Sequence, residues 1–223
     1  MAQEIERKFL LCNSDWRNLA EAVHYRQGYL RSSHVPLRIH TLGTPARTSG
    51  FVLIVTEMAG TTYEYSIPIG DAIGLLDYLC YNTRQWMEGG ILYREGFLSR
   101  DAGHTIRFRI AGSKGFLTIK TRVVGLSRME YEFVIPTADA AALLDGLCEQ
   151  PQIEKYRYTI LYQGMVWEVD EFLGDNQGLF LAEVELDRPD QSIVLPPWIG
   201  TEVSGDERYY NSNLVKHPFS QWQ

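Results

Sequence analysis

The sequence is poor in cysteine and contains no long apolar run. Its three cysteines, Cys12, Cys80 and Cys148, are widely spaced and form no CxxC pair, which argues against a disulfide framework or a zinc site. No apolar stretch approaches the roughly 20 residues of a membrane-spanning helix, so no membrane partner is expected. A motif-bearing segment begins at Glu4, which leaves no room for a cleaved leader. We therefore expect a cytoplasmic protein with reduced cysteines.

Positive charge is also scarce. The chain has 21 lysines and arginines against 28 acidic residues, which gives a formal net charge of −7. Binding to nucleic acids or anionic membranes needs a positive surface field, so neither is expected as a general partner. One enclosed basic site for a small anion remains compatible with this balance. The hydrophobic fraction of 45% over 223 residues is ordinary for a globular protein with a sizeable core.

One segment of the chain occurs twice. Residues 63–80 and 131–148 are identical at eleven of eighteen positions, and the match continues upstream between YRQGYL at 25–30 and YREGFL at 93–98. A unit of about four strands and a helix is therefore repeated. Two copies are too few for a solenoid. We expect one domain over 1–223 that contains a local duplication, with one copy at 25–80 and the other at 93–148.

Sequence periodicity predicts a mainly β protein of the α+β class. Helices are predicted at 15–23, 70–80 and 138–149. Alternating polarity predicts strands at 3–11, 23–32, 35–43, 50–58, 62–68, 90–99, 104–112, 115–123, 128–135, 153–163, 165–173 and 179–187. About a dozen strands favour a closed or nearly closed antiparallel barrel, because closure removes exposed strand edges.

Charged residues recur at every second position of several predicted strands and therefore share one face of each strand. These sets are Glu4, Glu6 and Lys8; Arg107 and Arg109; Thr118 and Lys120; Arg128, Glu130 and Glu132; Lys155 and Arg157; Glu168 and Asp170; and Glu183 and Glu185. Any one set could simply face water. Like charges such as Glu183 and Glu185, however, would repel by roughly 3 kcal/mol if enclosed. Carboxylates without histidine or cysteine suit Mg²⁺ or Mn²⁺, whereas arginine and lysine suit a phosphate chain.

The motifs that carry these charges follow one another in a fixed order. They are EIERKF at 4–9, QGYL at 27–30, IRFR at 106–109, TIK at 118–120, RMEYE at 128–132, EKYRY at 154–158, WEVDEF at 167–172, EVEL at 183–186 and WIGTEV at 198–203. This series covers nearly the whole chain and resembles the CYTH, or triphosphate tunnel metalloenzyme, superfamily. The resemblance implies an eight-stranded antiparallel tunnel-like β-barrel with covering helices, to which this chain adds a duplicated β-rich segment.

The resemblance also implies an activity, a cofactor and a set of site residues. The expected activity is metal-dependent hydrolysis of a triphosphate, either inorganic tripolyphosphate or a nucleoside triphosphate, with Mg²⁺ or Mn²⁺. The residues expected to hold the phosphates are Lys8, Arg107, Arg109, Lys120, Arg128, Lys155 and Arg157. Those expected to hold the metal are Glu4, Glu6, Asp170, Glu183 and Glu185. Glu4 and Glu6, next to Lys8, are the expected catalytic group, with a carboxylate accepting the proton of the attacking water.

The two copies differ at the positions that carry these charges. The copy at 25–80 has His40 where the other has Arg109, and Val55 where the other has Lys120. We therefore expect 25–80 to be a degenerate accessory copy. The intact copy at 93–148 should build the tunnel with strand 3–11 and the last three strands. Which copy supplies the second barrel strand stays open, because QGY at 27–29 fits the family pattern better than EGF at 95–97.

Three alternatives to hydrolysis of tripolyphosphate remain. An adenylyl cyclase of the same family would replace water with the 3′-hydroxyl group of the nucleotide. A thiamine triphosphatase would need an aromatic cradle for its substrate. A non-catalytic polyphosphate-binding protein would use the accessory copy for assembly. Whichever function holds, a homodimer is a candidate assembly of the chain.

Overall fold

The computed structural model describes residues 2–30, 37–44, 47–55, 61–88, 91–98, 104–121 and 127–222. The chain is mainly β, with two antiparallel sheets, and belongs to the α+β class. It divides into two compact units, one made of residues 31–106 and the other of residues 2–30 with 107–223. No helix in the described part is long and apolar enough to span a membrane.

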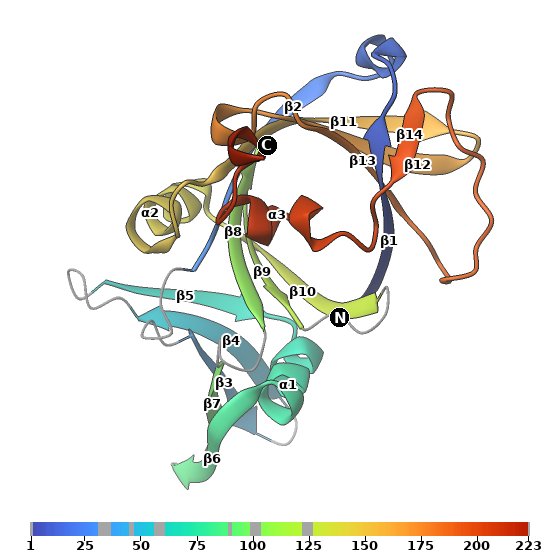
Figure 1. Ribbon diagram of the computed structural model, residues 1–223. Helices are drawn as coiled ribbons and strands as arrows, with labels where there is room; N and C mark the ends of the chain where they lie inside the picture. The colour runs from blue at the N-terminus through green and yellow to red at the C-terminus, as the bar shows by residue number, and fades with distance from the viewer. Residues whose placement is uncertain are drawn as a thin grey trace. The chain divides into compact units, whose positions relative to one another are not determined.

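The larger unit contains a nine-stranded sheet. Its strands are β1 (Ala2–Leu11), β2 (Ala22–Tyr29), β8 (Thr105–Ala111), β9 (Lys114–Lys120), β10 (Ser127–Ile135), β11 (Ile153–Tyr162), β12 (Met165–Phe172), β13 (Phe180–Glu185) and β14 (Ile199–Glu202). Their order is β10-β9-β8-β2-β11-β12-β13-β1-β14, and β1 also pairs with β10. Figure 1 shows these strands following one another around a ring, with helix α2 (Thr137–Leu147) on the outer side.

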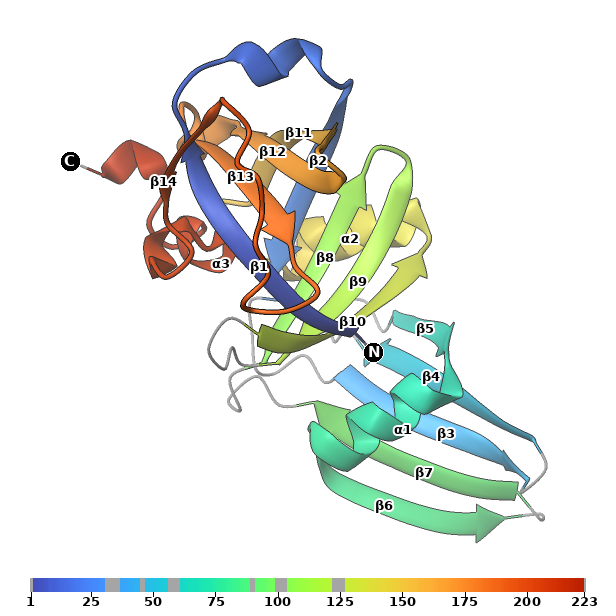
Figure 2. The same ribbon diagram turned by 90° about the vertical axis from the view of Figure 1, so that its right-hand side faces the viewer.

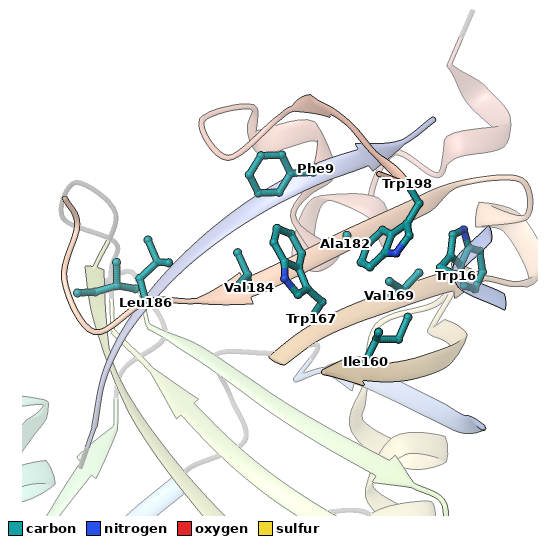
Figure 3. Packing of buried hydrophobic residues seen from close by; sticks show 10 residues of the cluster. Phe9, Trp16, Ile160, Trp167, Val169, Ala182, Val184, Leu186 and Trp198 are labelled. Carbon is teal, nitrogen blue, oxygen red and sulfur yellow. The ribbon is translucent and has the colours of Figure 1, made fainter. Parts of the chain in front are cut away.

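One face of this sheet packs into an aromatic core. Phe9, Trp167 and Trp198 are fully buried, with Trp167 lying 5.7 Å from each of the other two ring centroids (Figure 3). Trp16 joins the same core from the 3-10 turn at Asp15–Asn18. Because strand residues alternate between faces, packing Phe9 here directs its neighbour Lys8 to the opposite face of β1.

The C-terminal segment packs on that opposite face. It contains α3 (Asn211–Leu214) between two 3-10 turns at Glu207–Tyr209 and Phe219–Gln221. Leu214 and Val215 form a buried cluster with Phe172 and Leu181. The cross-strand partners of Phe172 and Leu181 are Lys155 and Asp170, and direct partners share a sheet face. An apolar cluster therefore borders the charged part of this face.

The smaller unit contains a five-stranded sheet covered by one helix. Its strands are β3 (Leu37–Thr44), β4 (Arg47–Val55), β5 (Thr62–Ile67), β6 (Cys80–Glu88) and β7 (Ile91–Leu98), in the order β5-β4-β3-β7-β6. Helix α1 (Ile69–Tyr78) lies across one face of this sheet (Figure 2). Its Leu75 and Leu76 are buried, as are Ile39 and Val52 of the sheet.

The helix of each unit approaches its sheet at a glycine. A Cβ atom added at Gly50 would lie 2.5 Å from the Cβ atom of Ala72, and one added at Gly115 would lie 2.9 Å from that of Ala140. These distances are too short for any side chain larger than hydrogen. Gly50 and Gly115, like Ala72 and Ala140, occupy matching positions of the sequence repeat, so both units use the same helix–strand contact.

Most predicted elements are present, one predicted helix is wrong, and the sequence pattern does not predict β6, β14 or the short helix α3. The helix predicted at 15–23 is wrong: the chain makes only the turn Asp15–Asn18, fixed by hydrogen bonds from the Asp15 amide to Asn13 Oδ1 and from Trp16 Nε1 to the Asn13 carbonyl. Alternation does not predict β6, because its side chains from Tyr81 onward are all exposed. The short strand β14 was also not predicted.

The first strands of the two copies are exchanged between the sheets. β2 pairs with β8 and β11, although 25–30 was expected in the accessory copy. β7 pairs with β3 and β6, although 93–98 was expected in the tunnel. The near identity of YRQGYL and YREGFL is the physical reason that pattern alone could not assign them: either segment has the side chains to occupy either place.

Candidate active site

The charged face of the nine-stranded sheet gathers side chains from strands that are distant in sequence. Cross-strand partners include Lys8 with Glu183, Arg157 with Asp170, and Lys120 with Glu130. The buried cations on this face are Lys8, Arg107, Lys120, Lys155 and Arg157, and Arg109 is half-buried. The structure thus brings together the charged side chains that alternation placed on separate strand faces.

Asp170 lies at the centre of the first group of charges and is fully buried. Its Oδ1 accepts a hydrogen bond from Arg157 Nε at 2.6 Å, and its Oδ2 accepts one from Arg157 Nη2 at 2.6 Å and another from Lys155 Nζ. Arg157 Nη2 also donates to Glu183 Oε2 at 2.8 Å, and Glu183 accepts from Lys8. Two lysines, one arginine and two carboxylates therefore form one buried network.

The two buried lysines of this network differ in the direction of their pKa shifts. Burial and the neighbouring Arg157 guanidinium lower the pKa of Lys155 to about 8, against the attraction of Asp170. Burial also opposes the charge of Lys8, but Glu183, Glu6 and Asp170 outweigh it and raise the Lys8 pKa. Burial would raise the pKa of Glu183, yet Lys8, Arg157 and Lys155 hold it well below its usual value.

A second group of charges lies on β8, β9 and β10. Arg107 Nη2 donates to Thr118 Oγ1 at 3.1 Å, and Arg109 Nη2 donates to Glu132 Oε2 at 2.8 Å. Burial and the adjacent Arg107 lower the pKa of Arg109. Lys120 Nζ lies 2.8 Å from Glu130 Oε2. Each cation of this group contacts a hydroxyl or carboxylate group of another strand of the sheet.

The sequence patterns did not single out Tyr25, which lies among three cations. The cationic groups of Arg157, Arg109 and Lys155 are 5.4, 5.6 and 6.0 Å from its ring centroid. Gln27, two residues further along β2, is buried and donates through Nε2 to the Tyr29 hydroxyl at 3.2 Å. The period-two spacing of these three polar-tipped residues was a usable signal, since it places all of them on the charged face.

The carboxylates provide only hard oxygen donors. Glu6 lies directly opposite Glu185, and Glu168 directly opposite Glu183, so like charges face each other about 5 Å apart between their Cβ atoms. Opposed carboxylates are destabilising unless a cation lies between them, and oxygen donors suit Mg²⁺ or Mn²⁺. Within the described residues no three acidic, histidine or cysteine side chains are grouped closely enough to hold an ion. The donor chemistry therefore fits a divalent cation, while most of these carboxylates contact lysine or arginine.

Two expected site residues are described only in part. Glu4 and Arg128 are paired across β1 and β10, but their side chains lie outside the described residues. Their positions in register extend the same face, since Glu4 is two residues from Glu6 and Arg128 two residues from Glu130.

The chain resembles proteins of known activity over most of their lengths. A profile of the CYTH domain family matches residues 91–213. An inorganic triphosphatase of Acetivibrio thermocellus is 50% identical over 136 residues, which cover 60% of this chain and 86% of that protein. An inorganic triphosphatase of Nitrosomonas europaea is 38% identical over 126 residues, which cover 55% of this chain and 82% of that protein. A solved structure of an inorganic triphosphatase is 26% identical with a TM-score of 0.50, covering 96% of this chain and 95% of that one.

Proposed function

Because the chain belongs to the CYTH domain family, we propose that it is an inorganic triphosphatase that hydrolyses tripolyphosphate with a divalent cation. One observation carries the proposal: the buried cations and their carboxylate partners all lie on one face of the nine-stranded sheet. The pairing of β1 with both β13 and β10 supports an eight-stranded tunnel around this face. The similarity to two inorganic triphosphatases supports tripolyphosphate as the substrate.

The phosphate chain would be held by the basic residues of the charged face. These are Lys8, Arg107, Arg109, Lys120, Arg128, Lys155 and Arg157. Arginine gives planar bidentate contacts to phosphate oxygens, and lysine gives a compact positive charge. Burial strengthens these contacts because the surrounding dielectric is lower than that of water. Substrate binding would exchange some of the present carboxylate partners of the cations, such as Glu183 beside Lys8, for phosphate oxygens.

That exchange frees carboxylates to bind a metal ion. We assign the metal to Glu4, Glu6, Glu183 and Glu185. Asp170, also expected as a ligand, is fully buried and accepts three hydrogen bonds from Lys155 and Arg157, one more than Glu183 accepts from Lys8 and Arg157, so we assign Asp170 the role of orienting Lys155 and Arg157. When bound, Mg²⁺ or Mn²⁺ would neutralise charge on the phosphate chain and favour attack at phosphorus.

The reaction itself would transfer the terminal phosphoryl group to water. A carboxylate of Glu6 or Glu4 would accept the proton of the attacking water. Lys8 Nζ lies 3.8 Å from Glu6 Oε1, and its raised pKa keeps it protonated beside that carboxylate. Lys8 would therefore stabilise negative charge and leave the proton transfer to the glutamates.

A substrate panel tests this proposal. Purified protein is incubated with tripolyphosphate, ATP or thiamine triphosphate in Mg²⁺ or Mn²⁺, and the products are identified. We expect orthophosphate and pyrophosphate from tripolyphosphate, at the highest kcat/KM of the three substrates. Cyclic AMP with pyrophosphate from ATP would instead identify a cyclase. Tight binding without turnover in either metal would identify a polyphosphate-binding protein.

A further inference from the structure

Strand β6 forms one edge of the five-stranded sheet and is exposed along its length. Among the described strands its neighbour is β7, and every side chain from Tyr81 to Glu88 is exposed. Figure 2 shows β6 as the outermost strand of this sheet. An edge strand presents unpaired backbone N–H and C=O groups, which can pair with a strand of another chain.

Strand β6 carries one positive and one negative residue at equal distances on either side of a central residue. Arg84 precedes Trp86 by two positions and Glu88 follows it by two, so all three share one face of the strand. The register with β7 is regular from Arg84 to Glu88 and shifts between Tyr81 and Arg84. The positive φ of 50° at Asn82 lies within that irregular part. The regular part of β6 is therefore centred on Trp86.

We propose that β6 pairs antiparallel with β6 of a second copy of this chain, with Trp86 on the twofold axis. In this register, Arg84 lies directly opposite Glu88 of the partner subunit, and the symmetry creates the same pair twice. Parallel pairing would instead place Arg84 opposite Arg84 of the partner subunit. The strand that complements Arg84-Gln85-Trp86-Met87-Glu88 in charge is thus the same strand in the opposite direction, which favours a second copy over an unrelated partner.

Aromatic contacts support the same register. Trp86 stacks on Tyr93 with ring centroids 5.2 Å apart and an interplanar angle of 6°. The Arg84 guanidinium lies 5.2 Å from the Trp86 ring centroid. Pairing at Trp86 would join the two Trp86–Tyr93 stacks into one row across the axis, and cross-strand aromatic pairs stabilise antiparallel strands. It would also cover Met87, which is 70% exposed.

The expected association is weak. A single short strand pair buries less surface than the roughly 1,600 Å² of a standard stable interface. We therefore expect a dissociation constant on the order of micromolar. The dimer should be visible in sedimentation velocity experiments on the full chain as a weight-average sedimentation coefficient that rises with concentration.

Charge reversal tests both the interface and its register. Arg84→Glu places two glutamates opposite each other, and Glu88→Arg places two arginines opposite each other, so each variant alone should be monomeric at concentrations where the wild type dimerises. An equimolar mixture should form a heterodimer, because each Arg84→Glu chain then meets complementary charges. Glu64→Arg, on the opposite edge strand β5 where Glu64 is exposed, is the matched control and should dimerise like the wild type.

Three results would overturn the proposal: a wild type that stays monomeric at about 200 μM, well above the expected dissociation constant, single variants that associate like the wild type, or a mixture that stays monomeric. Far-UV circular dichroism and thermal unfolding, measured on the same samples, show whether the variants are folded, and phosphate release from tripolyphosphate reports their activity. Arg84 and Glu88 lie in the smaller unit, so activity should be unchanged. Loss of the dimer with retained activity separates this proposal from the proposed function.

Discussion

Tyr25 shows how a neutral side chain can organise a cationic site. Its ring faces Arg109, Lys155 and Arg157 at 5.4 to 6.0 Å, and a cation over an aromatic face gains about 0.5–2 kcal/mol. The ring therefore offsets part of the repulsion among three like charges while leaving their donor groups available to phosphate. Carboxylates perform the same task elsewhere on this face, as Glu132 does for Arg109.

Replacing the Tyr25 ring with an aliphatic side chain should weaken substrate binding. We expect Tyr25→Leu to raise the KM for tripolyphosphate on the order of 2- to 30-fold, the equivalent of about 0.5–2 kcal/mol of lost cation–π attraction. Tyr25→Phe keeps the ring and should stay within about twofold of the wild type. Steady-state kinetics of the wild type and the two variants test this prediction. Equal KM values for Leu and Phe would show that the ring plays no such part.

At the residue scale, alternation in the sequence indicated which charged residues share a strand face, but it did not single out the neutral residues that lie among them. Alternation placed Lys8, Arg107 and Lys155 on strand faces that the structure unites. Tyr25 and Gln27 show the same alternation, but an aromatic or amide side chain in a strand is equally common in ordinary cores. Their proximity to the cations depends on the pairing of β2 with β8 and β11, which is a tertiary property.

Close contact between a glycine and a helix alanine fixes the helix against the sheet in both units. At Gly115, an added Cβ atom would lie 2.8 Å from the Ile135 carbonyl oxygen as well as 2.9 Å from the Ala140 Cβ atom. Backbone atoms cannot move away as a flexible side chain could. The contact explains why glycine is needed at this position of β9 although glycine weakens a strand interior.

A methyl group at Gly115 should therefore destabilise the protein. We expect Gly115→Ala to lower the free energy of unfolding by about 1–3 kcal/mol, the usual cost of overpacking. Gly146→Ala is the control, because an added Cβ atom there meets nothing within 4 Å and alanine favours the helix by up to about 1 kcal/mol. Urea unfolding followed by tryptophan fluorescence reports both, since Trp16, Trp167, Trp198 and Trp222 lie in this unit. A stabilising Gly115→Ala would refute the contact.

At the element scale, the sequence predicted the strands and helices in which buried and exposed side chains recur with a regular period. The strands from β8 to β13 and the helices α1 and α2 carry that pattern and were found. Strand β6 does not, because its side chains are exposed on both faces and its place is fixed by pairing with β7. The sequence predicts a helix where the structure has the turn Asp15–Asn18. Trp16 is the one buried residue of that turn, and a single apolar residue has no spacing that separates a turn from the first turn of an amphipathic helix.

At the scale of the whole molecule, the smaller unit interrupts a pair of adjacent strands. Tyr29 of β2 is paired with Arg107 of β8, so the antiparallel register brings Leu30 opposite Ile106. Residues that face each other in this way are about 5 Å apart, which a two-residue hairpin turn can span. The segment between them is therefore inserted where a hairpin would suffice.

Excision of this segment tests whether the larger unit is the enzyme. A variant in which Asn-Gly replaces residues 31–105 should fold, because the type I′ turn suits the twist of paired strands. It should keep its kcat for tripolyphosphate within about tenfold, or about 1.4 kcal/mol. It should also be monomeric, since it lacks β6. The same excision combined with Lys120→Ala is the inactive control. A soluble, folded but inactive excision variant would show that the smaller unit is required for catalysis.

The duplication could be inferred from the sequence, but the exchange of first strands could not. The segments at 25–30 and 93–98 differ at only two positions, so local preference does not choose between the sheets. In β2, Gly28 lies against α2, where an added Cβ atom would be 2.7 Å from that of Cys148, and Gly96 occupies the matching position in β7. The order of the chain determines which segment joins which sheet. β2 lies before the inserted segment and β7 lies near the end of that segment.

We propose that triphosphate is hydrolysed on the charged face of the nine-stranded sheet and that the five-stranded sheet takes no part in the chemistry. Phosphate release from tripolyphosphate in Mg²⁺ or Mn²⁺ by the wild type, Lys120→Ala and Arg38→Ala tests it most directly. Lys120 is buried beside Glu130 on the charged face, whereas Arg38 lies on β3 of the other sheet at the position that matches Arg107. The account predicts that Lys120→Ala abolishes activity and that Arg38→Ala largely retains it. Equal loss in both variants, or no turnover by the wild type in either metal, would contradict it.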